Sequence, residues 1–128
     1  MRIFMNAWFE RFSRKHGITN TALLDAIARA ERGLVDADLG GGVIKQRVAR
    51  AGQGKSGGIR TIVLYRTSER AFFIYGFEKS DRDNIDGDEE ATFKRAARHV
   101  LKLSEKQLAA LIDQRQLTEV NGYGQEIS

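Results

Sequence analysis

The chain has 128 residues, of which 41% are hydrophobic, so it is long enough for one buried core and too short for a second. It contains no cysteine, which excludes disulfide bonds and thiolate metal sites. No run is apolar for long enough to span a membrane or to serve as a secretory leader, and we expect a cytoplasmic protein that makes no membrane contact.

Positive charge is concentrated in the first half of the chain. Residues 1–66 carry 12 basic and 5 acidic side chains, a balance of +7, whereas residues 67–128 carry 9 basic and 12 acidic ones, a balance of −3. The whole chain has a net charge of +4. This asymmetry favours a polyanionic partner for the first half, and nucleic acid is the partner we expect.

The first predicted elements are a short strand over residues 2–5 and a helix over residues 7–16. Asn6 can cap this helix, and Gly17 ends it. Aromatic side chains lie on one side of the helix, and we predict that they belong to the core: Trp8, Phe9 and Phe12.

A second helix is expected to begin at a cap on Thr19 or Asn20 and to end at Arg32. The two helices are predicted to form a hairpin that covers a sheet. Residues 34–42, with two aspartates and three consecutive glycines, are predicted to be a connection.

Two strand-like runs follow, at residues 43–49 and 59–66, and a glycine-rich loop joins them. From Gly41 to Arg66 there is no acidic residue, and the basic ones are Lys45, Arg47, Arg50, Lys55, Arg60 and Arg66. Alternation along the first strand projects Lys45 and Arg47 from the same face, about 7 Å apart, where they can clamp a phosphate. A solvated edge strand, charged to deter aggregation, explains the same pair equally well.

The loop contains Gly54-Lys55-Ser56, which is reminiscent of a phosphate-binding P-loop. That motif requires a further glycine where Ala49 stands, and it must be followed by a helix. A strand follows instead, so we reject this interpretation.

The remaining chain is predicted to complete an α+β fold. The apolar run 71–78 is expected to be a central strand, and three successive strands with short loops predict an antiparallel meander. Acidic residues at the start of the next helix suit its dipole, and Ser104 with Gln107 matches a capping box for another. We expect a helix to about residue 102, a helix after 104, a strand over 117–120, and a flexible tail over 121–128.

This order of elements resembles the RelE/ParE superfamily of toxins from bacterial type II toxin–antitoxin systems, and its HigB-like branch most closely. The resemblance spans residues 1–120, which we expect to be one domain. Two segments carry it: residues 45–60, with their basic strand and glycine loop, and residues 75–85, which read Tyr-Gly-Phe-Glu-Lys-Ser-Asp-Arg-Asp-Asn-Ile. It implies a RelE-like fold, with an N-terminal helical hairpin on a small antiparallel sheet and C-terminal helices. It also implies cleavage of mRNA in the ribosomal A site, under the control of a cognate antitoxin, which we expect to be a helix-turn-helix protein.

The resemblance also implies site residues. Lys45 and Arg47 match basic positions on the second strand of RelE-type toxins, and Arg60 matches an arginine that opens the third. The family has a basic residue in the loop after the fourth strand, where Lys79 and Arg82 flank Ser80. Where the family has a tyrosine, this chain has Ile85 or Asp86.

RNA cleavage by its own 2′-hydroxyl needs a base, stabilisation of the phosphorane and protonation of the leaving oxygen. A guanidinium can donate two parallel hydrogen bonds to a phosphorane, so we assign that role to Arg60. Lys45 is our candidate base, because the neighbouring cations favour its neutral form. Arg47 is expected to hold substrate phosphate, and Lys79 or Arg82 to assist. Further contacts with RNA are expected from Arg50, Lys55, Arg66 and Tyr75.

No metal or cofactor is expected. His16 and His99 are far from the basic hairpin in sequence, and we interpret both as structural or solvated. Two other functions remain open: a ParE-like poison of DNA gyrase, and a non-catalytic module that binds RNA or DNA.

Overall fold

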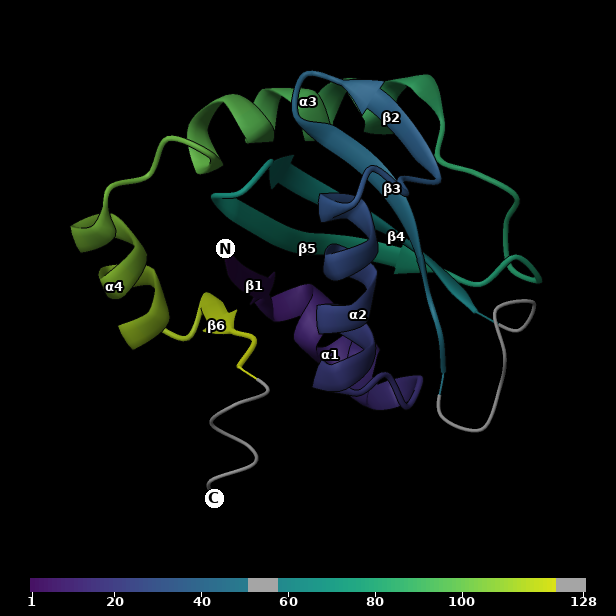
Figure 1. Cartoon of the computed structure of the whole chain (residues 1–128), viewed down its shortest axis with the longest axis horizontal. Coiled ribbons are helices and arrows are strands. Elements are labelled where there is room, and N and C mark those ends of the chain that lie inside the picture. Colours follow the sequence, from purple (N-terminus) through teal and green to yellow (C-terminus); the bar gives the residue numbers. More distant parts are fainter. Residues whose placement is uncertain (51–57, 122–128) are drawn as a thin grey trace.

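The computed structural model describes residues 1–50 and 58–121, and it has an α+β fold in which helices cover both faces of one six-stranded sheet (Figure 1). Across the sheet the strand order is β2-β3-β4-β5-β1-β6. Within the described ranges, no helix is both long and apolar enough to cross a bilayer. In chain order the elements are β1 (Arg2–Asn6), α1 (Ala7–Lys15), α2 (Asn20–Glu31), β2 (Ala37–Gly40), β3 (Val43–Val48), β4 (Ile59–Arg66), β5 (Arg70–Phe77), α3 (Gly87–Val100), α4 (Glu105–Asp113) and β6 (Leu117–Glu119).

The sheet is mixed, so the prediction of an antiparallel sheet is wrong. Strands β2 to β5 are antiparallel, as the predicted meander requires. Strand β1, however, runs parallel to β5, and β6 pairs antiparallel with the other side of β1. Strands β1 and β5 can be parallel because a long stretch of chain, which begins with α1, separates them. Parallel neighbours need a crossover connection of this kind.

Strand β2 lies inside the segment that we predicted to be a connection. It is only four residues long, and the turn that joins it to β3 is made by Gly40, Gly41 and Gly42. All three have positive φ, at 84°, 63° and 84°, a conformation in which a side chain is strained. The three glycines therefore form a tight turn between two strands.

Helices α1 and α2 cover the same face of the sheet. Asn6 and Thr19 cap them, by accepting hydrogen bonds from the backbone N–H groups of Phe9 (2.8 Å) and Ala22 (3.1 Å). Their buried side chains form one cluster with residues of the sheet, whose members include Phe9, Leu23, Ile27, Val48, Val63 and Phe73. Packing of the two helices as a hairpin stays a prediction.

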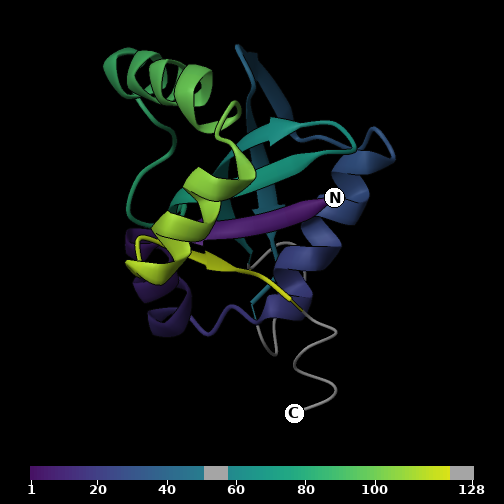
Figure 2. The ribbon, with the colours of Figure 1, turned by 90° about the vertical axis from the view of Figure 1, so that its left-hand side faces the viewer.

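Helices α3 and α4 pack on the opposite face, and Figure 2 shows α2 and α3 on either side of the sheet. Both begin with a capping box, at Asp86 with Glu89 and at Ser104 with Gln107, and the second of these was predicted. The core of this face includes Phe4, Ile62, Leu64, Phe72, Ala97, Leu101 and Leu108. After Asn121, the predicted tail lies outside the described residues.

Candidate nucleic-acid interface

Three of the predicted site residues come together on one face of the sheet. Arg47 on β3 lies directly opposite Arg60 on β4, and Lys45 is two residues away on the same strand. The three side chains line one hollow of about 260 Å³, which Asp36 and Ala37 complete. We call it the basic hollow.

The guanidinium groups in the basic hollow have no carboxylate partner within the described part of the chain, although Asp36 lines the same hollow. There, neither Arg47 nor Arg60 forms an ion pair with a carboxylate. The carboxylate of Asp36 is instead engaged by the backbone, since it accepts a hydrogen bond from the N–H of Arg47 at 2.5 Å. Lys45 donates from Nζ to Oδ1 of Asn84 at 3.2 Å. Two guanidiniums are thus available to an oxyanion such as phosphate.

The predicted catalytic residue Arg82 is held by other side chains. Its guanidinium donates to both carboxylate oxygens of Glu89, at 2.5 and 3.0 Å, and to the hydroxyl of Tyr75 at 3.1 Å. The hydrogen bond with Glu89 raises the pKa of Arg82 above its already high ordinary value, and the same contact lowers the pKa of Glu89. Arg82 therefore supplies a fixed positive charge and no proton.

The other predicted cations are dispersed. Arg66 lies six residues along β4 from Arg60, about 20 Å away by the rise of a strand. Lys79 is exposed in the turn after β5 and does not line the basic hollow. Lys55 lies outside the described residues. The roles of Arg66, Lys79 and Lys55 stay predictions.

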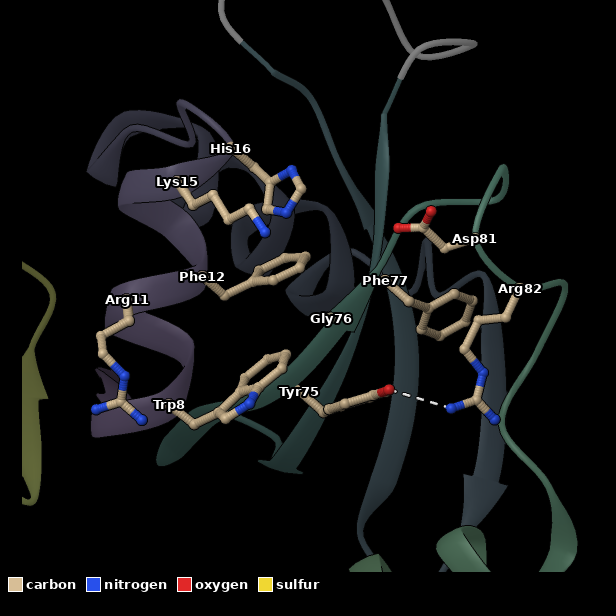
Figure 3. Close-up of a pocket in the computed structure, with 10 residues that line it drawn as sticks. All are labelled: Trp8, Arg11, Phe12, Lys15, His16, Tyr75, Gly76, Phe77, Asp81 and Arg82. Atoms are coloured by element: carbon tan, nitrogen blue, oxygen red, sulfur yellow. Dashed lines mark hydrogen bonds between the residues drawn. The ribbon is translucent and has the colours of Figure 1, made fainter.

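A larger hollow, of about 430 Å³, lies between α1 and the end of β5 (Figure 3). We call it the α1–β5 cleft. Its lining has four aromatic residues, Trp8, Phe12, Tyr75 and Phe77, and four basic ones, Arg11, Lys15, His16 and Arg82. Gly76 and Asp81 complete the lining.

The cleft exists because β1 is shorter than β5. Pairing between the two strands stops at Met5 and Phe73, so the last residues of β5 have no strand beside them on that edge. The side-chain amide of Asn6 donates to the carbonyl of Ile74 at 3.2 Å, which replaces the missing strand contact. The chain then turns into α1, and one face of that helix, from Trp8 to Lys15, forms one wall of the cleft.

Trp8 lies in that wall, and the prediction that it is a core residue is wrong. Its side chain is the most exposed of the three aromatic residues predicted on α1, with 39% of the residue accessible, whereas Phe9 is fully buried. The ring stacks on Tyr75 at a centroid distance of 4.8 Å and on Phe12 at 5.1 Å. Helical spacing correctly places Trp8, Phe9 and Phe12 on one side of α1, but that side of the helix extends past the edge of the sheet.

His16 also lines the cleft, where it is held by a carboxylate. Its Nδ1 lies 2.9 Å from Glu78, which also accepts hydrogen bonds from Arg50 at 2.8 Å and from Ser80 at 3.1 Å. The hydrogen bond from Ser80, followed by the charges of Arg50 and His16, lowers the pKa of Glu78. Arg50, a predicted RNA contact, is therefore tied to the imidazole through one carboxylate.

The sequence contains a signal for this wall that our reasoning did not use. Trp8, Arg11 and Lys15 are spaced by three and four residues, so they share one helical face with the cleft. Tyr75, a predicted RNA contact, lines the cleft. Tyr65 instead packs below α2 and donates a hydrogen bond to Glu31.

Comparison with known proteins places the chain in a family. No curated protein matches it. The family described as the RelE toxin of the RelE / RelB toxin-antitoxin system matches residues 1–120, a range that includes both hollows. The chain therefore belongs to the RelE toxin family, as the toxin component of a toxin–antitoxin system in which a cognate antitoxin is its partner.

Proposed function

We propose that this toxin cleaves mRNA in the ribosomal A site and that the basic hollow is its active site. One observation carries the proposal. Arg47 and Arg60 face each other across two strands beside Lys45, and within the described residues neither guanidinium is paired with a carboxylate. A cluster of three cations with one carboxylate nearby has an excess of positive charge that favours an anion, and the phosphates of RNA are such anions.

In the proposed reaction, Lys45 in its neutral form removes the proton of a 2′-hydroxyl group. The 2′-oxygen bonds to the adjacent phosphorus, and the bond from phosphorus to the 5′-oxygen breaks, which leaves a cyclic 2′,3′-phosphate and a 5′-hydroxyl end. A neutral amine can still donate to Asn84 while its lone pair accepts the proton, so the observed hydrogen bond is compatible with this role.

The two arginines are proposed to act on the phosphate. Arg60 donates to the oxygens that gain charge in the phosphorane, and Arg47 holds the substrate phosphate on the neighbouring strand. Lys79 is the candidate donor of a proton to the 5′-oxygen, because Arg82 remains charged and bound to Glu89. Lys79 lies outside the basic hollow, so this role requires its side chain to reach the bound RNA from the turn after β5.

We further propose a single domain over residues 1–120 that acts in the cytoplasm, where translating ribosomes are. The two segments around residues 45–60 and 75–85 support the HigB-like branch of the superfamily. A helix-turn-helix antitoxin that covers the basic hollow would keep RNA from it.

The test is induced expression in a bacterial host with mapping of RNA 5′ ends, for the wild type and Arg60→Ala. Arg98→Ala is the matched control, since it removes the same side chain from an exposed position on α3. We expect growth arrest and new cuts within translated codons for the wild type and for Arg98→Ala. Arg60→Ala is expected to lower cleavage by about 100-fold or more.

Two results would contradict the proposal. Full toxicity of a folded Arg60→Ala would show that the basic hollow is not the site. Growth arrest without cuts, together with a DNA-damage response, would indicate a gyrase poison instead.

A further inference from the structure

The α1–β5 cleft adjoins the basic hollow, and the proposed chemistry does not use it. Phe77, which lines the cleft, lies directly opposite Arg60 across β4 and β5. A strand of RNA with a phosphate at Arg60 would therefore reach the cleft within its neighbouring nucleotides.

One wall of the cleft is a continuous row of rings. His16 contacts Phe12 at a centroid distance of 4.3 Å, Phe12 stacks on Trp8, and Trp8 stacks on Tyr75. Gly76 forms the floor below Phe12, where a Cβ atom would lie 2.5 Å from the ring. Rings at the surface of a basic protein form platforms on which unpaired bases stack, whatever their sequence.

The rim of the cleft is positively charged. Arg11 and Lys15 are one helical turn apart on α1, and within the described residues neither pairs with a carboxylate. Lys15 and His16 face Phe77 and Asp81 across the cleft (Figure 3). Among the described residues of the lining, Asp81 is the sole acidic one, so the cations outnumber it.

We propose that the α1–β5 cleft binds one nucleotide of single-stranded RNA next to the cleaved phosphodiester. The base lies against the aromatic wall of Trp8, Phe12 and Tyr75, and the backbone phosphates meet Arg11 and Lys15. This inference rests on the proposed function, because it takes RNA as the ligand.

The size of the cleft restricts the ligand to one unstacked base. About 430 Å³ is within the range of pockets that hold a single small molecule, and a duplex does not enter such a space. Stacking on protein rings also requires a base that is free of its own helix, as in single strands. An acidic protein segment would satisfy the cations, but it would leave the exposed aromatic wall unused.

Trp8 provides a direct probe, because it is the only tryptophan in the chain and lies in the cleft. The experiment titrates the full chain with a short 2′-O-methyl RNA, which cannot be cleaved because its 2′-oxygens are blocked, and follows the fluorescence of Trp8. The variant is Arg11→Gln/Lys15→Gln. The matched control is Arg98→Gln/Lys102→Gln, which removes the same charge from exposed positions at the end of α3.

We expect saturable quenching of Trp8, with affinity about tenfold lower in Arg11→Gln/Lys15→Gln and changed less than about twofold in the control. An absence of saturable quenching would overturn the inference. So would equal weakening in both variants, since that would reflect net charge alone, or a stronger response to an acidic peptide of equal charge, which would indicate a protein partner.

The result is independent of the proposed cleavage. If the wild type makes no cuts in cells while Trp8 is quenched as expected, the proposed cleavage fails, and the part of the inference that stands is binding of single-stranded RNA in the cleft. If the wild type cuts mRNA and Trp8 does not respond, the inference about the cleft fails alone.

Discussion

Gln46 on β3 is polar and fully buried against α2. Its replacement tests how firmly the strand that carries Lys45 and Arg47 is held in the fold. Its amide Nε2 donates to the carbonyls of Ala26 at 2.8 Å and Leu34 at 3.1 Å. Its Oε1 accepts from the N–H of Asp36 at 3.0 Å. One side chain thus ties the strand that carries Lys45 and Arg47 to α2 and to the segment after it.

We predict that Gln46→Met lowers the free energy of unfolding by about 3 kcal/mol. Methionine nearly preserves the volume of glutamine, so little packing is lost. Three hydrogen bonds contribute about 1 kcal/mol each, and their loss leaves three backbone groups without this partner in the interior. The lost hydrogen bonds and the unpartnered backbone groups are two sides of the same free-energy change, so the total stays at about 3 kcal/mol.

The measurement is urea denaturation followed by far-UV circular dichroism. With an m-value of about 1.5 kcal/mol per molar urea, the midpoint is expected to fall by about 2 M. Gln114→Met, at an exposed position that ends α4, is the control and should change the free energy of unfolding by less than about 0.5 kcal/mol. If Gln46→Met is within about 1 kcal/mol of the wild type, the hydrogen bonds do not stabilise the fold as argued.

Two further substitutions test the packing around the cleft and below α2. Gly76→Ala places a Cβ 2.5 Å from the ring of Phe12. We expect the free energy of unfolding, measured by urea denaturation, to fall by about 1 to 3 kcal/mol, and the tryptophan fluorescence to change. Unchanged values of both would contradict the close approach. Burial and the hydrogen bond to Glu31 raise the pKa of Tyr65 to about 12. The stability that the fold gains from keeping this hydroxyl protonated is therefore complete below about pH 10 and is lost as the pH rises towards 12. Tyr65→Phe should cost about 1 to 2 kcal/mol at pH 7 and should remove this alkaline loss, and an unchanged pH dependence would refute the assignment.

The basic hollow could be predicted from the sequence because its geometry is local. Strands β3 and β4 are consecutive, each has a clear alternation, and antiparallel pairing then places their outward side chains in rows. Once Lys45 and Arg47 are known to share a face, a register that aligns Arg47 with Arg60 brings all three together. Strand β2 was missed, since three consecutive glycines indicate a loop, and the structure shows that the strand Ala37–Gly40 leads into their turn.

The α1–β5 cleft could not be predicted because it depends on contacts that are distant in sequence. It requires β1 to lie parallel to β5 and their pairing to stop at Met5 and Phe73, before β5 ends at Phe77. Neither property follows from the apolar run at residues 2–5. Without them, an aromatic residue such as Trp8 on an amphipathic helix is most simply interpreted as core. The same distance hides the contact of His16 with Glu78.

The ion pairs show which basic side chains have a carboxylate partner in the fold and which do not. The carboxylates of the C-terminal half neutralise some basic side chains, as Glu105 and Glu119 do for Arg2, and as Glu89 does for Arg82. Within the described residues, the cations without a carboxylate partner that line the two adjoining hollows are Arg11, Lys15, Lys45, Arg47 and Arg60. A polyanion that binds there breaks no existing ion pair of these five, and among the described lining residues it meets only the carboxylates of Asp36 and Asp81. Paired arginines elsewhere would have to exchange one partner for another. This difference favours the two hollows over the rest of the basic surface as the path of an RNA strand.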